Sequence, residues 1–123
     1  MKVFMTSRED YLKAILVLSR EKAEVRSVDL AEYLGFSKAS VSRAVSLLCS
    51  EGYLYVMGHG LYLTEAGMNI AEQTYEKFCF FKEQLMGLGI SSKLACEDAC
   101  RLEHAISDAS FRKLRTALNS AKA

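Results

Sequence analysis

Residues 27–52 read SVDLAEYLGFSKASVSRAVSLLCSEG, and this stretch decides the fold. Asp29 is typical of the first turn of a helix and Gly35 of a helix end, so a short helix is predicted between them. Ser37 is a residue type that begins helices, and it predicts a second helix over 38–51. Two helices that are joined by a tight, glycine-containing turn indicate a helix-turn-helix.

The second helix has an apolar face for the core and a polar face that is left for the outside. In a helix-turn-helix, the first residues of this helix reach base edges in the major groove. The candidate DNA contacts are Ser37, Lys38, Ala39, Ser40, Ser42 and Arg43. Arg43 is the best candidate for a bidentate contact to guanine, and Ala39 for a contact to a thymine methyl group. A solvated helix face would have the same composition, so the prediction depends on the turn and on the hairpin that follows.

That hairpin is predicted from two β-prone segments, 53–56 and 61–63, which a glycine-rich tip separates. A hairpin directly after a recognition helix is a wing. His59 at the tip is a candidate contact to a phosphate or to the minor groove. The hairpin carries no Lys or Arg, which wings that contact DNA usually have, so a wing that does not contact DNA remains an equal alternative.

Helical patterns continue on both sides of this core. Ser7 begins a capping box, and the apolar positions after it predict a helix over 7–20. Beyond the wing, apolar positions that step by three and four predict a long helix over 65–87, then helices over 92–106 and 108–119. The predicted fold is mainly α: a winged helix-turn-helix with a small β-hairpin wing, followed by a helical dimerisation domain.

The domain boundary is predicted within the first turn of the long helix. Residues 1–66 would form the winged-helix DNA-binding domain, and residues 67–123 the helical dimerisation and metal-binding domain. The long helix carries a stripe of large apolar side chains, including Phe78, Phe81 and Leu85, which suits a homodimer surface. Such a stripe is also typical of an ordinary core.

Composition limits the function classes. The net charge is +1, so no global positive field attracts the chain to DNA, and a dimer that reads two half-sites would be needed for tight binding. No run approaches the roughly 18 apolar residues of a membrane span, and no signal peptide is visible at the start. We therefore expect a cytoplasmic protein without a membrane partner, whose four cysteines are reduced. The two histidines lie too far apart in the predicted fold to build an enzyme active site.

A second functional pattern lies at residues 96–104, which read CEDACRLEH. On a helix, Cys96, Cys100, Glu103 and His104 would share an arc of roughly 100°. Thiolate, carboxylate and imidazole together suit one divalent transition-metal ion, and the thiolate favours Fe²⁺, Zn²⁺ or Co²⁺ over Mn²⁺. Each residue also has an ordinary structural explanation, such as a buried cysteine or a solvated carboxylate.

The order of these parts resembles the diphtheria toxin repressor and manganese transport regulator family of metal-dependent winged-helix repressors. The resemblance covers nearly the whole chain and is carried by residues 9–12 (EDYL), 37–43 (SKASVSR), 61–67 (LYLTEAG) and 99–107 (ACRLEHAIS). It implies that Asp10 is a metal ligand in the first helix, together with Cys100, Glu103 and His104. The aspartate is similar to the manganese branch and the cysteine to the diphtheria branch.

The chain departs from both branches at positions where they have further ligands. Lys13 replaces a glutamate of the manganese branch, Phe78 a histidine of both branches, and Lys82 a glutamate of the diphtheria branch. Cys96 stands where the diphtheria branch has a histidine, and it is a possible substitute ligand. We therefore do not expect the two-metal arrangement of the family here, and we expect a single bound ion instead.

The predicted function is a metal-responsive DNA-binding regulator, a repressor of metal homeostasis genes, in which one ion joins the DNA-binding half to the dimer half. Two alternatives stay open. The first is a metal-independent winged-helix regulator that senses redox state through Cys96 and Cys100, which lie one helical turn apart. The second is a winged-helix module that binds proteins, which the neutral charge and the uncharged wing would suit.

Overall fold

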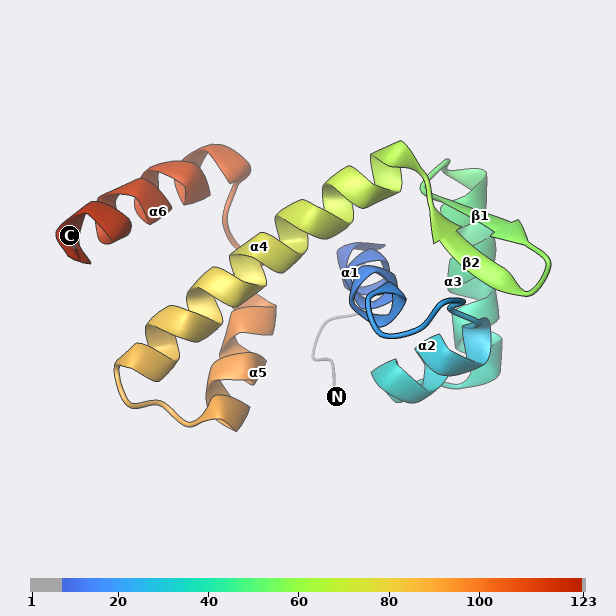
Figure 1. The fold of residues 1–123 in the computed structure, drawn as a ribbon, viewed down its shortest axis with the longest axis horizontal. Coiled ribbons are helices and arrows are strands. Elements are labelled where there is room, and N and C mark those ends of the chain that lie inside the picture. Colours follow the sequence, from blue (N-terminus) through green and yellow to red (C-terminus); the bar gives the residue numbers. More distant parts are fainter. Residues whose placement is uncertain (1–7, 123) are drawn as a thin grey trace. The chain divides into compact units, whose positions relative to one another are not determined.

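The computed structural model describes residues 8–122, which divide into two compact units. The first unit runs to Glu72, and the second begins at Gln73, inside the long helix. The described elements, in chain order, are α1 (Arg8–Ser19), α2 (Ser27–Leu34), α3 (Lys38–Ser50), β1 (Leu54–Met57), β2 (Gly60–Leu63), α4 (Glu65–Gly87), α5 (Ser92–Leu102) and α6 (Asp108–Lys122) (Figure 1). The predicted fold class, a mainly helical winged helix followed by a helical domain, is confirmed.

Helix α1 is the central element of the first unit. All seven residues from Asp10 to Leu16 are buried, and the helix contacts α2, α3 and β2. Such all-round burial is typical of a core helix rather than of a surface helix. An ion pair of 3.0 Å between Arg8 and Glu51 also connects its first turn to the end of α3. The predicted cap residue Ser7 lies outside the described residues.

The helix-turn-helix forms as predicted. Helix α2 ends at Gly35, whose φ of 73° is in the left-handed region and whose N–H donates to the Ala31 carbonyl oxygen at 2.9 Å. The Ser37 hydroxyl then accepts from the Ser40 N–H at 3.1 Å, which caps the start of α3. Leu30 and Val41 are fully buried where the two helices pack.

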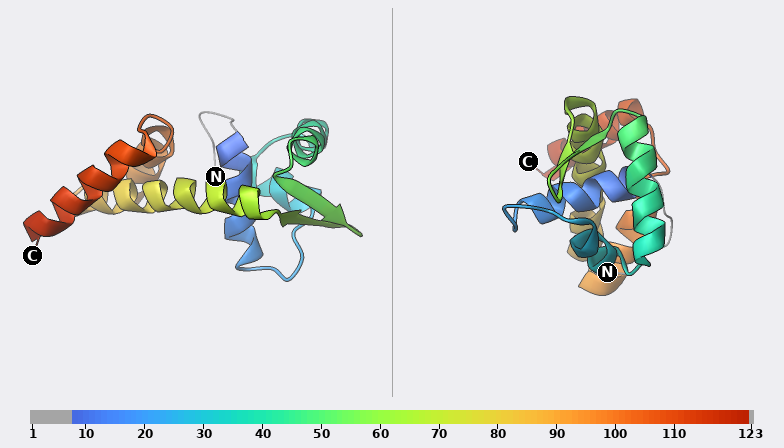
Figure 2. Two further views of the ribbon diagram at one scale, coloured as in Figure 1. Left: turned by 90° about the horizontal axis from the view of Figure 1, so that it is seen from above. Right: turned by 90° about the vertical axis from the view of Figure 1, so that its right-hand side faces the viewer.

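The wing is a two-stranded antiparallel hairpin that lies beside α3 (Figures 1 and 2). Leu54 pairs with Leu63 at its base and Met57 with Gly60 at its tip, which leaves a two-residue turn. Gly58 in this turn has a φ of 63°, a conformation that glycine adopts without strain. The tip thus corresponds to the glycine-rich segment that the sequence indicated.

The start of α4 is fixed to the base of the wing. Thr64 donates its hydroxyl to the Gly52 carbonyl oxygen at 2.7 Å and accepts from the Gly67 N–H at 3.1 Å. A Cβ atom at position 67 would overlap the Tyr53 carbonyl oxygen, so only glycine fits there. The predicted bounds of this helix, 65–87, are confirmed.

The second unit contains an aromatic cluster that joins α4 to α6. The rings of Phe80 and Phe111 meet edge to face, with centroids 5.4 Å apart, and Phe81 contacts both. Ser91 caps α5, and Ser107 caps α6. Within residues 8–122, no helix is long and apolar enough to span a membrane.

Helix α5 is shorter than predicted. It ends at Leu102 rather than at residue 106, so Glu103 is its C-cap and His104 lies in a turn. The N–H of His104 bonds back to Arg101 at 3.3 Å, three residues earlier, which tightens the chain out of the α-helix. Helix α6, in contrast, continues past the predicted end at 119 to Lys122.

Candidate metal-binding and DNA-binding residues

The turn after α5 brings two predicted metal ligands together. The Nε2 atom of His104 lies 3.3 Å from Oε1 of Glu103, and their side chains are only 8% and 0% exposed. Glu103 keeps a helical backbone conformation, and its N–H still bonds to Ala99 at 3.0 Å. The carboxylate therefore stays close to the orientation that a continuing helix would give it. Both donors are held away from bulk water.

Cysteines lie one and two turns before this pair on α5. Cys100 is buried, with 4% exposure, and Cys96 is half-buried. All four cysteines of the chain are free thiols in the structure. The second unit thus offers a thiol, a carboxylate and an imidazole along one end of α5. This donor set fits a divalent transition-metal ion of intermediate softness.

Lys77 of α4 contacts the segment that follows the Glu103–His104 turn. Its Nζ atom lies 2.6 Å from Oδ1 of Asp108 and donates to the Ile106 carbonyl oxygen at 3.2 Å. Sequence reasoning missed this role. A signal was present, because Lys77 lies three residues after Thr74 and four before Phe81, on the apolar stripe of the long helix.

The remaining predicted ligand, Asp10, belongs to the first unit. It lies in the first turn of α1 and is 3% exposed. Lys13, one turn later, is also buried, with 4% exposure. Phe78 pairs with the ring of Tyr75, at a centroid distance of 6.4 Å. Two positions at which the related branches have ligands are therefore occupied by a buried lysine side chain and by a ring in an aromatic contact.

The start of α3 shows which candidate DNA contacts are already engaged. The Ser37 hydroxyl caps the helix and bonds to the Ser40 hydroxyl at 3.0 Å, and Arg43 reaches that same hydroxyl at 3.5 Å. The side chains of Lys38, Ala39, Ser42 and Arg43 are exposed. Ser37 and Ser40 therefore organise the helix start. Lys38, Ala39, Ser42 and Arg43 face solvent, and Arg43 is also bonded to the Ser40 hydroxyl.

Behind this surface, α1 supports α3 through a buried ring. Tyr11 packs against Phe36, with centroids 6.1 Å apart, and is 6% exposed. Burial raises the pKa of the Tyr11 hydroxyl above its ordinary value of 10.0, although the nearby positive charge of Arg43 lowers it in part. Tyr11 is thus a neutral packing residue.

The wing has an unusual surface for a DNA contact. His59 is exposed at the tip, as predicted. Tyr55, Val56 and Met57 are 48%, 53% and 62% exposed, and the Tyr55 ring stacks on Tyr62 at 5.4 Å. The surface of the hairpin is therefore aromatic and apolar rather than basic.

Comparison with protein families gives matches to both halves of the chain. The model described as the N-terminal DNA-binding domain of the iron-dependent repressors matches residues 3–60. The model of their metal-binding and dimerisation domain matches residues 64–123.

Individual relatives give the same result. The transcriptional regulator MntR of Escherichia coli O6:H1 is 32% identical over 108 residues, which are 87% of this chain and 70% of the relative. The HTH-type transcriptional regulator MJ0568 of Methanocaldococcus jannaschii is 34% identical over 112 residues, which are 89% of this chain and 90% of the relative.

Among solved structures, the manganese regulator SloR superposes with a TM-score of 0.81 at 33% identity. The match covers 94% of this chain and 55% of SloR, so the chain spans about half the length of that regulator. The two family models together cover nearly all of this chain, from α1 to α6. The chain therefore belongs to the iron-dependent repressor family, whose members are metal-responsive, DNA-binding transcriptional regulators and not enzymes.

Proposed function

We propose that this chain acts as a homodimeric repressor in the cytoplasm, and that one divalent transition-metal ion per protomer raises its affinity for operator DNA. The observation that carries the proposal is the buried pair of Glu103 and His104 in the turn after α5. A carboxylate and an imidazole side by side, close in sequence to a buried thiol, are a metal-binding donor set rather than an ordinary core.

The proposed ligands come from both units. Cys100, Glu103 and His104 supply the thiolate, the carboxylate and the imidazole, and Asp10 of α1 supplies a second carboxylate. Cys96, one helical turn before Cys100, would substitute for the histidine ligand that the chain lacks. When bound, the ion supplies a fixed positive charge that two carboxylates and a thiolate share.

We propose a single ion because the positions of further ligands lack donors. Lys13 and Lys82 stand where the related branches have carboxylate ligands, and Phe78 has no ligand atom. The thiolate of Cys100 favours Fe²⁺, Zn²⁺ or Co²⁺ over Mn²⁺. In this respect the chain would differ from SloR, which is described as a manganese regulator.

Control of DNA binding then follows from linkage. An ion that binds better to the DNA-competent arrangement of the two units shifts the population toward it, and DNA must tighten metal binding by the same factor. In the DNA complex, Lys38, Ala39, Ser42 and Arg43 of each protomer would face one major-groove half-site. His59 is the proposed phosphate contact of the wing, and Ser37 and Ser40 hold the start of α3.

Competition binding of Fe²⁺, Mn²⁺, Zn²⁺ and Co²⁺ tests the ligand assignment. We expect Cys100→Ala to weaken Co²⁺ binding at least tenfold, and the double variant C96A/C100A to abolish the thiolate-to-cobalt absorption. Cys79→Ala, which removes a half-buried thiol from α4, is the matched control and should change neither quantity. Equal Co²⁺ affinity in the wild type and Cys100→Ala would overturn the assignment.

A further inference from the structure

Helix α6 has a polar outer face that the proposed metal and recognition sites do not use. Its inner side is anchored by Phe111, which is 3% exposed. The side chains on the opposite arc of roughly 120° are all exposed and include no acidic group. We define this basic face by five residues: Arg112, Lys113, Thr116, Asn119 and Ser120.

The neighbouring charges of α6 are already engaged, unlike those of the basic face. Arg115 forms an ion pair with Glu76 and lies over the Phe111 ring, 5.4 Å from its centroid. Asp108, the one acidic residue of α6, is held by Lys77. Within residues 8–122, neither of the two cations of the basic face takes part in an ion pair.

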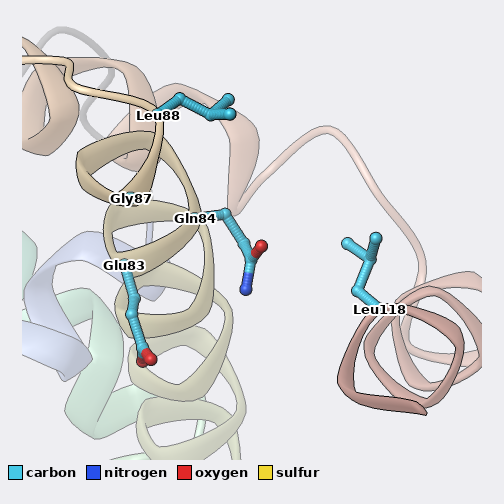
Figure 3. Close-up of a pocket in the computed structure, with 5 residues that line it drawn as sticks. All are labelled: Glu83, Gln84, Gly87, Leu88 and Leu118. Carbon is cyan, nitrogen blue, oxygen red and sulfur yellow. The ribbon is translucent and has the colours of Figure 1, made fainter. Parts of the chain in front are cut away.

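A shallow hollow lies between these two cations. It is lined by Arg112, Lys113, Thr116 and Ala117. The Thr116 hydroxyl bonds to the Arg112 carbonyl oxygen at 2.9 Å, which fixes the side chain against the helix. A second pocket of α6, where Leu118 faces Gln84 of α4 and Leu88 just after that helix, is partly apolar and has no cation in its lining (Figure 3).

The distribution of charge along the chain shows why this face matters. Residues 1–72 contain eight Lys or Arg and nine Asp or Glu, a formal charge of −1. Residues 73–123 contain eight Lys or Arg and six Asp or Glu, a formal charge of +2. The winged-helix unit is therefore slightly negative, although its partner DNA carries a negative charge every ~1.7 Å along the helix axis. A basic surface on the second unit would therefore add to the sequence-independent attraction to DNA.

We propose that the basic face of α6 binds the phosphate backbone of duplex DNA, outside the bases that α3 reads. Guanidinium, ammonium, hydroxyl and amide groups are the side-chain donors that contact phosphate oxygens in protein–DNA complexes. From Arg112 to Ser120 the face is roughly 12 Å long, which is enough for more than one phosphate. The proposal rests on DNA binding by this family, and it does not depend on the identity of the metal ion.

The test uses a random-sequence duplex, because phosphate contacts are independent of sequence. Its affinity is measured by fluorescence anisotropy at several salt concentrations, without added metal. In the double variant R112Q/K113Q, the slope of log K against log salt should become smaller by about 0.9 for each lost phosphate contact, or about 1.8 per protomer. The charge-retaining variant R112K/K113R should keep the wild-type slope.

The control K93Q/R101Q removes the same charge from exposed positions of α5 and should keep the slope. An unchanged slope in R112Q/K113Q, an equal loss in the control, or no binding of random duplex by the wild type would each overturn the proposal. The metal-dependent change in operator affinity should persist in R112Q/K113Q. Absence of that change in the wild type would contradict the proposed function instead, so the two failures are distinguishable.

Discussion

Lys77 and Asp108 form a 2.6 Å ion pair that ties α4 to the first turn of α6, and the same ammonium group binds the Ile106 carbonyl oxygen. The Lys77 side chain is 9% exposed, whereas that of Asp108 is 46% exposed. The pair closes the turn that begins with Glu103 and His104. We therefore expect the position of these two proposed ligands to depend on Lys77, a residue of a different helix.

Replacing Lys77 should weaken metal binding as well as stability. Lys77→Met keeps most of the side-chain volume but leaves Asp108 and the Ile106 carbonyl oxygen without their shared donor, at a cost of about 1–3 kcal/mol in the free energy of unfolding. With the turn loosened, we expect the Kd for Co²⁺ to rise several-fold at a temperature where the variant is fully folded. Isothermal titration and urea unfolding measure the two effects.

Lys93→Met, on the exposed side of α5, is the control. A stability loss with unchanged Co²⁺ affinity would show that Lys77 does not position the ligands.

Arg43 should contribute to sequence recognition rather than to general DNA affinity. If its guanidinium makes a bidentate contact to guanine, Arg43→Ala should cost about 1–3 kcal/mol on a duplex selected from a random pool by the metal-loaded wild type. Arg43→Lys should not restore this loss, because an ammonium group lacks the planar fork. Arg20→Ala, at an exposed position outside α3, is the control. Competition with random duplex provides the decisive comparison, since an equal loss on both DNAs would assign Arg43 to phosphate.

The start of α2 should be sensitive to acid. The Lys22 ammonium and the Arg26 N–H both donate to the Asp29 carboxylate at 2.9 Å, and they lower its pKa below the ordinary value of 3.8. The folded state therefore binds this proton more weakly than the unfolded state. The resulting stability is present above pH 3.8 and is lost as the pH falls through the lower pKa of the folded state.

Urea unfolding of wild type and Asp29→Asn between pH 2.5 and 7 tests this dependence. We expect a difference in stability at pH 7 that shrinks below pH 3.8. At the alkaline end, the carboxylate raises the pKa of Lys22 above 10.5, so the contribution of the pair persists below that pH and is lost as the pH rises through the higher value. Glu32→Gln, on the same helix, is the control. A stability difference that stays constant over the acid range would contradict this account.

The sequence predicted the helix-turn-helix well because its signals are local. The turn has a positive φ that favours glycine at position 35, and the start of α3 has a cap that suits serine at position 37. A few neighbouring residues were therefore sufficient to predict both helix boundaries. The end of α5 was predicted wrongly because it is a tertiary effect. No residue near Leu102 is a helix breaker, and the turn is closed by Lys77, about 30 positions earlier in the chain.

Within the candidate site, the sequence predicted the donor residues but not their support. Glu103 and His104 lie together as the spacing indicated, although they do so in a tight turn rather than on a continuous helix. Ser37 was predicted as a DNA contact, and the structure shows its hydroxyl engaged as a cap. A serine suits either role, so composition alone could not distinguish them.

The central claim is that one ion and DNA binding are thermodynamically linked. The most direct test measures the Kd of the dimer for the selected duplex with saturating Co²⁺ and with chelator, together with the number of ions bound per protomer. We predict one ion per protomer and at least tenfold tighter DNA binding with Co²⁺, about 1.4 kcal/mol of coupling. His104→Ala should remove this difference. Equal DNA affinity with and without the ion would contradict the account.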